Sequence, residues 1–283
     1  MNILNGKKVL FIGNSFTYYG KCVVFKDRTV LEQEPRNNDE GYFYQICKAN
    51  GADVSVTNWT WGGHALRDTF GEKCAYGKEC DGENHFSYLK DLVYDYVVIQ
   101  EGSRNEGSAS TIEWCKKIME IFKEANPNVK FLFPVHIGYY ILSPSYKDLL
   151  LNIEEFEKLG MTVFNWGKLV NDVMTGKIKV PGAKEEYNKN SFIVNQSEKD
   201  GFHPNMLSGY ITALMTYCAI TGESAVGQDY SFCKDTAVNK DFDAEKYCST
   251  YYTYDGATTN FPQIFDSKSD MKGIQQLIDK YLV

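Results

Sequence analysis

The sequence has no apolar run approaching the roughly 20 residues that a membrane-spanning helix needs. It also lacks any cluster of Lys or Arg longer than a pair, and its formal net charge is −7 at pH 7. Nucleic acids and anionic lipids attract basic surfaces, so we expect neither nucleic acid nor a membrane as a partner. Nothing in the sequence indicates an oligomeric state.

Two well-known motifs are also missing. There is no Gly-x-Ser-x-Gly motif, which argues against an ordinary α/β-hydrolase, and no Gly-rich phosphate loop with its lysine, which argues against nucleotide binding. Residues 1–6 are too short and too polar for a secretory signal peptide. The sequence therefore predicts a cytoplasmic protein unless a signal peptide has been removed.

The chain has eight cysteines, but with 283 residues and 43% hydrophobic content it does not need disulfides to form a core. Cys47, Cys115 and Cys218 fall in apolar helical patterns, which predicts buried thiols. Cys74, Cys80 and His85 are spaced C-x5-C-x4-H, which is not a zinc-ligand spacing. We expect no metal site and no cofactor.

Hydrophobic periodicity predicts alternating strands and helices. The expected strands are residues 8–12, 53–58, 96–99, 129–135 and 161–164, and the expected helices are residues 39–50, 86–92, 111–125, 144–159, 168–174 and 204–222. This alternation predicts an α/β fold with a doubly wound, mostly parallel sheet between two helical layers. Residues 223–283 are weakly periodic until a helical pattern at 271–282, so we expect a C-terminal extension packed on the domain formed by residues 1–222.

The stretch that organises the chain is a short apolar run, residues 9–12, followed by Gly13, Asn14 and Ser15. Its composition is typical of a buried central strand that ends in a tight turn. Ligands of such sheets bind at the carboxyl edge, where the turn places the Ser15 hydroxyl. A serine at this point either caps a helix or acts as a nucleophile.

A second block follows 185 residues later, with Asp200 and His203 three residues apart on one turn. The carboxylate can hold one imidazole N–H, which leaves the other ring nitrogen available to take a proton from a serine. Pro204 is expected to open the last core helix, with His203 as its cap residue. That position would bring the imidazole to the edge of the sheet.

The two blocks, G-N-S-F-T at residues 13–17 and D-G-F-H-P at residues 200–204, resemble those of the SGNH (GDSL-like) hydrolase family. The resemblance covers about residues 7–222, and the first block is most similar to a branch found mainly in bacteria. It implies a five-stranded, flavodoxin-like sheet. It also implies a catalytic triad of Ser15, His203 and Asp200.

The resemblance further implies an oxyanion hole with three donors. The Ser15 backbone N–H is the first, and Gly63, from the Gly62-Gly63 pair after the second strand, is the second; these glycines otherwise simply form a turn. The third block departs from the family pattern, which usually has Gly-x-Asn-Asp after the third strand. Here we favour Gln100, which leaves the strand end directly, with Asn105 as the alternative.

Several other residues lie near the expected site. His136 is interpreted as a hydrogen-bonded structural histidine, and His64 either lines the cleft or lies in a solvated loop. Four aromatic residues beside the two turns are core residues by default but would also suit a sugar platform: Tyr18, Tyr19, Trp59 and Trp61.

The sequence thus predicts a serine esterase that forms an acyl-serine intermediate. The expected substrate carries an O-acetyl or other short acyl group, on a carbohydrate or another small molecule. The irregular third block keeps a second interpretation open, a carbohydrate-binding module on a hydrolase fold that has lost catalysis. Acyl transfer by the same triad is a third.

Overall fold

The structure is a computed structural model. It describes residues 2–23, 36–37, 41–71, 85–102, 107–142, 147–183, 186–193, 202–233 and 261–282. The predicted residues Cys74, Cys80, Asn105 and Asp200 lie outside these ranges.

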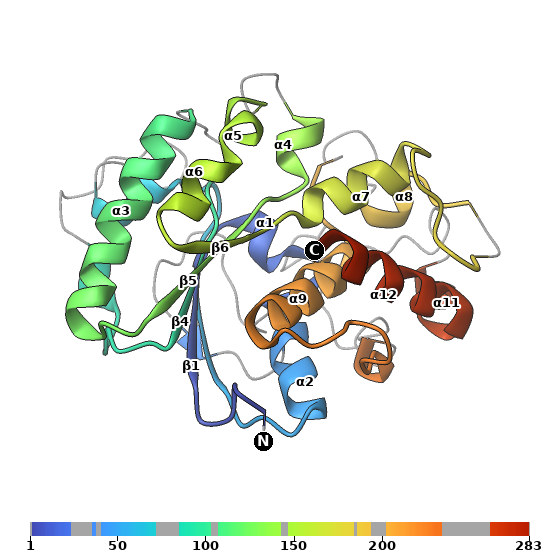
Figure 1. Ribbon diagram of the computed structural model, residues 1–283, viewed down its shortest axis with the longest axis horizontal. Helices are drawn as coiled ribbons and strands as arrows, with labels where there is room; N and C mark the ends of the chain where they lie inside the picture. Colours follow the sequence, from blue (N-terminus) through green and yellow to red (C-terminus); the bar gives the residue numbers. More distant parts are fainter. Residues whose placement is uncertain are drawn as a thin grey trace, which may run out of the picture.

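A six-stranded sheet forms the middle of the fold (Figure 1), in the order β2-β3-β1-β4-β5-β6. Five strands are parallel: β1 (Lys8–Gly13), β3 (Ser55–Thr60), β4 (Tyr96–Ile99), β5 (Lys130–Pro134) and β6 (Met161–Phe164). These match the five predicted strands. The short β2 (Arg36–Asn37), antiparallel to β3 at the sheet edge, was not predicted.

Helices cover both faces of the sheet, as predicted. One face carries α2 (Tyr42–Ala49), α7 (Trp166–Met174), α9 (Met206–Thr221) and α12 (Lys268–Leu282), and the other carries α3 (Ser108–Ala125), α5 (Lys147–Leu151) and α6 (Ile153–Lys158). The shorter elements are α1 (Ser15–Tyr18), η1 (Tyr19–Lys21), η2 (Leu66–Phe70), η4 (His85–Tyr88), α4 (Gly138–Ile141), α8 (Lys189–Phe192) and α11 (Phe261–Asp266).

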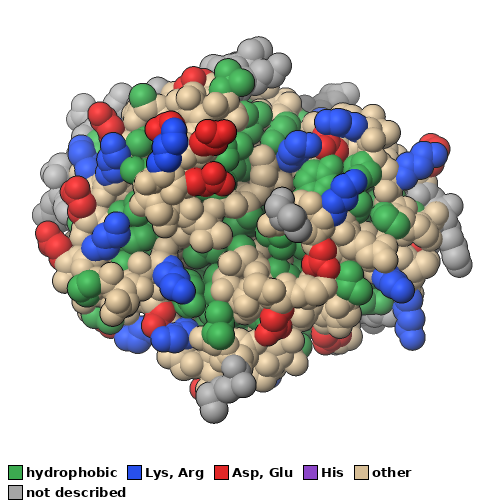
Figure 2. All heavy atoms as spheres, in the orientation of Figure 1, with side chains coloured by type: hydrophobic (Ala, Val, Ile, Leu, Met, Phe, Trp, Pro, Cys, Tyr) green, Lys and Arg blue, Asp and Glu red, His purple; other side chains and the backbone are tan. Residues whose placement is uncertain are grey.

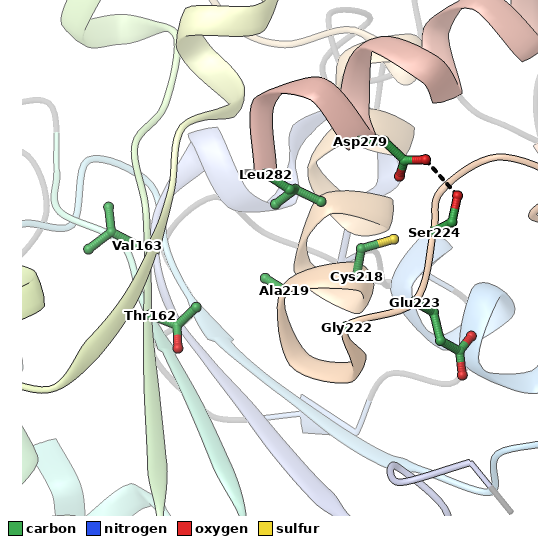
Figure 3. Close-up of a pocket in the computed structure, with 9 residues that line it drawn as sticks. All are labelled: Thr162, Val163, Cys218, Ala219, Gly222, Glu223, Ser224, Asp279 and Leu282. Carbon is green, nitrogen blue, oxygen red and sulfur yellow. Dashed lines mark hydrogen bonds between the residues drawn. The ribbon is translucent and has the colours of Figure 1, made fainter.

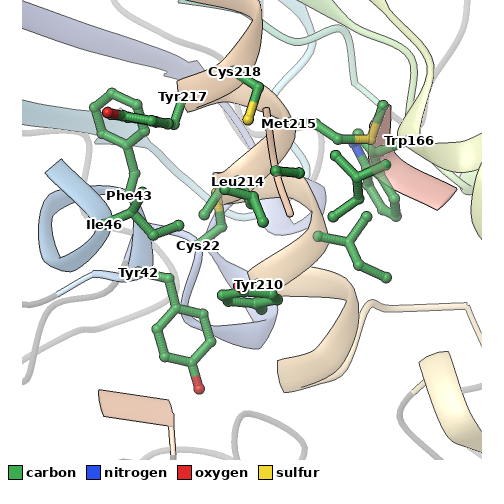
Figure 4. Close-up of a cluster of buried hydrophobic side chains, with 14 of the residues drawn as sticks. Cys22, Tyr42, Phe43, Ile46, Trp166, Tyr210, Leu214, Met215, Tyr217 and Cys218 are labelled. Atoms are coloured by element: carbon green, nitrogen blue, oxygen red, sulfur yellow. The ribbon is translucent and has the colours of Figure 1, made fainter. Parts of the chain in front are cut away.

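Strand β1 shows how the sequence produces these layers. Side chains alternate along a strand, so Val9 and Phe11 pack into the core that contains α9, while Leu10 and Ile12 pack into the core that contains α3. The α9 side of this packing is drawn in Figure 4. Being apolar on both faces, β1 can lie only inside the sheet.

Two helix predictions were wrong in detail. The segment 144–159 is two helices, because Asn152 between them has a non-helical backbone and its side chain donates a hydrogen bond to the Asp148 carbonyl. Residues 86–92 form no α-helix, only the 3₁₀ turn η4. The segment 176–199, predicted as a loop, contains the short helix α8.

The start of α9 also differs from the prediction. Asn205, not His203, is the cap residue: its side-chain oxygen accepts hydrogen bonds from the N–H groups of Leu207 and Ser208. An asparagine amide satisfies these donors better than an imidazole does. Pro204 instead forms an isolated bridge with Ile193.

The predicted C-terminal helix is confirmed as α12. Its Gln275 amide donates to the Tyr210 hydroxyl of α9 at 3.0 Å, and its Tyr281 hydroxyl donates to Asp172 of α7 at 2.8 Å. In Figure 1 this helix lies beside α9.

Cys47, Cys115 and Cys218 are buried, as predicted, and burial raises the pKa of the Cys218 thiol to about 12. On the face drawn in Figure 2, Lys and Arg side chains alternate with Asp and Glu rather than gathering into one basic patch. Within the described ranges, no helix combines the length and apolarity needed to cross a bilayer.

Backbone contact between two glycines fixes α9 against the segment after α1. Gly20 has φ +70°, and a Cβ at Gly209 would overlap the Gly20 carbonyl. Gly20 lies five residues after Ser15 and Gly209 six residues after His203. This contact therefore sets how closely the two predicted catalytic segments approach each other.

We expect Gly209→Ala to lower the free energy of unfolding by about 1–3 kcal/mol, because the added methyl group must separate two packed backbones. The higher helix propensity of alanine has the opposite effect and alone would raise the free energy of unfolding by up to about 1 kcal/mol. Urea unfolding measures the difference, and a stabilised variant would contradict the close contact. Ser208→Ala is the control: it removes only a hydrogen bond to the Phe192 carbonyl, worth about 1 kcal/mol.

Candidate active site

Ser15 and His203, 188 residues apart in the chain, are hydrogen-bonded to each other. The distance between Ser15 Oγ and His203 Nε2 is 2.8 Å. Ser15 opens the short helix α1 immediately after β1. This strand lies inside the sheet, between β3 and β4. The carboxyl end of that strand is where open α/β sheets bind their ligands. Ser15 and His203 therefore lie together at the carboxyl edge of the sheet, where the sequence analysis expected them.

The Ser15 hydroxyl is not used as a helix cap. Asn14 is the cap residue: its side-chain oxygen accepts the Phe16 N–H at 3.0 Å, while its amide nitrogen donates to the His64 carbonyl at 2.8 Å. Ser15 is 8% exposed, so the residue is buried but retains some contact with solvent. The helix-cap interpretation of Ser15 therefore does not hold.

Gly63 lies at the same edge of the sheet. Strand β3 pairs in parallel with β1, and just beyond it the Trp61 N–H donates to the Gly13 carbonyl at 3.2 Å. Gly63 then adopts φ +68°, a left-handed conformation that suits glycine. Its backbone is half-buried, and a Cβ there would meet no atom of the described residues within 4 Å. None of the described residues therefore fills the space next to the Gly63 Cα.

Gln100 faces the Ser15 turn with its amide oxygen. That oxygen accepts the Asn14 N–H at 3.2 Å and the Thr17 hydroxyl at 2.8 Å, and the amide nitrogen donates to the Glu101 carbonyl. Because a backbone N–H can only donate, the contact with Asn14 fixes which way the amide is turned. Gln100 therefore holds the turn, and this geometry gives no support to it as an oxyanion donor.

The same contact explains why residue 13 is glycine. A Cβ at Gly13 would lie 2.8 Å from both Gln100 Oε1 and Thr17 Oγ1, too close for either atom. The tight turn after β1 thus depends on close packing as well as on backbone freedom.

Two histidines near the site are buried. His64 lies neither in an open cleft nor in a solvated loop: its Nδ1 donates to the Gly13 carbonyl at 2.9 Å, and its Nε2 accepts from the Thr69 hydroxyl at 2.8 Å. His136 is a hydrogen-bonded structural histidine, as interpreted, with Nδ1 accepting the Gly138 N–H at 3.1 Å. Burial lowers the pKa of each imidazole to about 3, so both are neutral.

The sequence analysis missed Glu101, which follows Gln100 directly. Its buried carboxyl group accepts hydrogen bonds from the N–H groups of Leu66, at 3.2 Å, and Gly102. It therefore ties the end of β4 to the segment that follows Gly63. Burial raises the pKa of this carboxyl group to about 7. The available signal was its position at the carboxyl end of a central strand.

The aromatic residues do not form an exposed sugar platform. Trp59 and Trp61 are fully buried, and Tyr18 and Tyr19 are nearly so. Tyr19 instead stacks on the His203 imidazole, with ring centroids 4.1 Å apart. The partly exposed ring beside the pair belongs to Phe202, whose centroid is 4.2 Å from that of His203.

No cluster of three or more His, Cys, Asp or Glu side chains in the described residues is arranged to hold a metal ion. A cavity of about 440 Å³ lies elsewhere (Figure 3), between the edge strand β6 and the C-terminal ends of α9 and α12. Its lining includes Thr162, Cys218 and Asp279. Since His203 precedes the other end of α9, this cavity is separate from the Ser15–His203 pair.

The raised pKa of Glu101 predicts a pH-dependent stability. An unfolded glutamate titrates near 4.5 and the folded one near 7, so the stability associated with its protonated form is present below pH 4.5 and is lost as pH rises to 7. We expect Glu101→Gln to be more stable than wild type by up to about 3 kcal/mol at pH 8, and by little at pH 5. Urea unfolding of both proteins at the two pH values measures this. The titration of His64 and His136 is common to both and cancels in the difference. An equal difference at both pH values would show that Glu101 does not titrate in this range.

No known family model matches the sequence, and no curated protein matches it. Among solved structures, a DUF4886 family protein from Bacteroides uniformis superposes with a TM-score of 0.55 at 15% identity, over 97% of this chain and 93% of that chain. Two looser matches have TM-scores of 0.49. One is a mutant Axe2 acetyl-xylooligosaccharide esterase from Geobacillus, at 16% identity over 79% of this chain and 98% of that chain. The other is described as a putative GDSL-like lipase from Parabacteroides merdae, at 14% identity over 78% of this chain and 98% of that chain.

At these identities the similarity concerns the fold alone. The parallel strands follow the order 2-1-3-4-5 of flavodoxin-like sheets once the short antiparallel β2 is set aside. The chain therefore has a three-layer α/β fold with a flavodoxin-like order of parallel strands, and it shares its overall fold with the DUF4886 family protein.

Proposed function

We propose that this protein is a serine esterase in which Ser15 is the nucleophile and His203 the general base. The observation that carries the proposal is the 2.8 Å hydrogen bond between Ser15 Oγ and His203 Nε2 at the carboxyl end of β1. A serine hydroxyl is a weak nucleophile until a base takes its proton, and an imidazole at this distance can do so.

The reaction would follow two steps. Ser15 Oγ attacks the ester carbonyl carbon as its proton moves to His203 Nε2; the imidazolium then gives that proton to the departing alkoxide, which leaves as the alcohol. Water next attacks the acyl-serine, with His203 again taking a proton and returning it to Ser15 Oγ. Asp200 is our candidate for the carboxylate that orients the imidazole from its other nitrogen.

For the oxyanion we propose the backbone N–H groups of Ser15 and Gly63. Both residues belong to turns at the carboxyl ends of adjacent parallel strands, and no described residue fills the space next to the Gly63 Cα. Since the Gln100 amide is used inside the turn, Asn105 is our remaining candidate for a third donor. One such donor is typically worth on the order of 100- to 1000-fold in rate.

We further propose a short acyl group, such as acetyl, as the part of the substrate bound beside Ser15. Ser15 as a residue is only 8% exposed, and Phe16, which follows it, is 1% exposed, so the turn is closely surrounded. The leaving alcohol must lie near His203, which protonates it. The partly exposed Phe202 ring beside His203 offers an apolar surface there that suits the face of a sugar ring.

The test is hydrolysis of p-nitrophenyl acetate, butyrate and octanoate by wild type and Ser15→Ala. We expect kcat/KM for the acetate to fall by on the order of 1000-fold or more in the variant, and wild-type activity to decrease with acyl length. Equal rates in the two proteins would contradict the assignment of Ser15.

A fluorophosphonate probe provides a second readout that needs no turnover of a particular ester. We expect labelling of Ser15 in wild type and a large loss of labelling in His203→Gln, which keeps a side chain of similar length but no base. Thr17→Ser, on the same short helix, is the matched control and should be labelled normally. A wild-type protein that is neither labelled nor active would instead favour a binding module.

A further inference from the structure

Three aromatic rings of the described residues contact His203, and one of them stacks on it almost in parallel. The Tyr19 ring lies 4.1 Å from the imidazole, centroid to centroid, with an interplanar angle of 7°. The rings of Phe202 and Phe16 are tilted relative to the imidazole by 41° and 43°. Tyr19 thus covers a face of the imidazole, and Tyr19 itself is only 8% exposed.

Tyr19 is also fixed relative to the nucleophile. It terminates the helix that Ser15 begins, and its backbone N–H donates to the Ser15 carbonyl. The ring also packs against that of Tyr18, with centroids 5.3 Å apart and an interplanar angle of 28°. The next residue, Gly20, is in backbone contact with Gly209 of α9. One short segment, residues 15–20, therefore carries both the nucleophile and the ring that contacts the base.

We infer that Tyr19 is a positioning residue that orients the His203 imidazole for proton transfer with Ser15. The inference rests on the function proposed above. His203 lies in a bend before α9 rather than in a helix or strand, and Tyr19 contacts its imidazole from a different segment of the chain. A ring stacked on the imidazole limits rotation of the imidazole plane and keeps Nε2 directed at Oγ.

The same stack acts on charge during the reaction. When Ser15 Oγ–H breaks and a bond to Nε2 forms, the neutral imidazole becomes an imidazolium. The face of a tyrosine ring carries negative electrostatic potential and attracts a cation. The positive charge exists only after proton transfer begins, so the attraction favours the transition state over the ground state and affects kcat more than KM.

The experiment compares Tyr19→Phe, which keeps an aromatic face, with Tyr19→Leu, which removes it. Tyr42→Leu is the control, because Tyr42 is also a buried tyrosine but packs against Tyr210 and Phe232 rather than against His203. The first readout is kcat and KM for p-nitrophenyl acetate. The second is the imidazole spectrum by NMR, in which four histidines give few resonances and His203→Gln assigns the one of interest.

We expect Tyr19→Leu to lower kcat about 10- to 30-fold with KM nearly unchanged, and Tyr19→Phe to stay within about twofold of wild type. The His203 ring protons should be shifted upfield by the stacked ring in wild type and in Tyr19→Phe, and should move downfield in Tyr19→Leu. Tyr42→Leu should lose stability without either change.

Three results would overturn the inference. Unchanged His203 resonances in Tyr19→Leu would mean that the rings are not stacked. A moved resonance with wild-type kcat, while Ser15→Ala is inactive, would mean that Tyr19 packs on His203 without positioning it. If Ser15→Ala is as active as wild type, the proposed esterase function itself is wrong, and the NMR result still reports separately whether the stack exists.

Discussion

The candidate site depends on the tight turn that follows β1. The Gln100 amide oxygen stabilises the turn by accepting hydrogen bonds from the Asn14 N–H and the Thr17 hydroxyl. The same oxygen leaves no room for a side chain at residue 13. Asn14 in turn holds the His64 carbonyl. Three strand ends, those of β1, β3 and β4, are thus joined by hydrogen bonds around one glycine, and Ser15 takes its position from all three.

The position of His203, the other residue of the pair, depends on the packing of α9. His203 precedes α9, and α9 is fixed by the Asn205 cap at its start and by the Gly209–Gly20 contact one turn further on. Neither of these contacts involves the imidazole. The distance between Ser15 and His203 is therefore determined by the backbone packing of two glycines, and the hydrogen bond between the side chains forms within that geometry.

The sequence predicted those parts of the fold whose pattern has one physical interpretation. Residues 96–99 and 161–164 are apolar runs between breakers, and both are strands with the predicted bounds. It could not predict features in which several polar groups compete for the same partners. Asn152 breaks a helix that hydrophobic periodicity alone continues, and Asn205 takes the cap that the Pro204 signal assigned to His203.

The candidate site shows the same limit. The two blocks identified Ser15 and His203 because residue type and strand end together specify where they lie. The sequence placed Gln100 correctly at a strand end, but its role depends on the orientation of its amide. That orientation is fixed by the Asn14 N–H, a contact that is visible only in the folded structure. The position of Glu101 at a strand end was only a weak signal, since a single acid after a strand is usually solvated.

The buried titratable groups near the Ser15 turn have charge states that are consistent with a reaction that generates a negative charge at Ser15. His64 and His136 are neutral, and Glu101, with a pKa raised to about 7, is largely protonated at mildly acidic pH. In a medium of low dielectric constant, an ionised carboxylate would act over several ångströms on a nearby oxyanion. Protonation of Glu101 removes that charge, and its neutral form still accepts the Leu66 N–H. Below about pH 7, Glu101 can therefore keep its place at the end of β4 without adding a negative charge there.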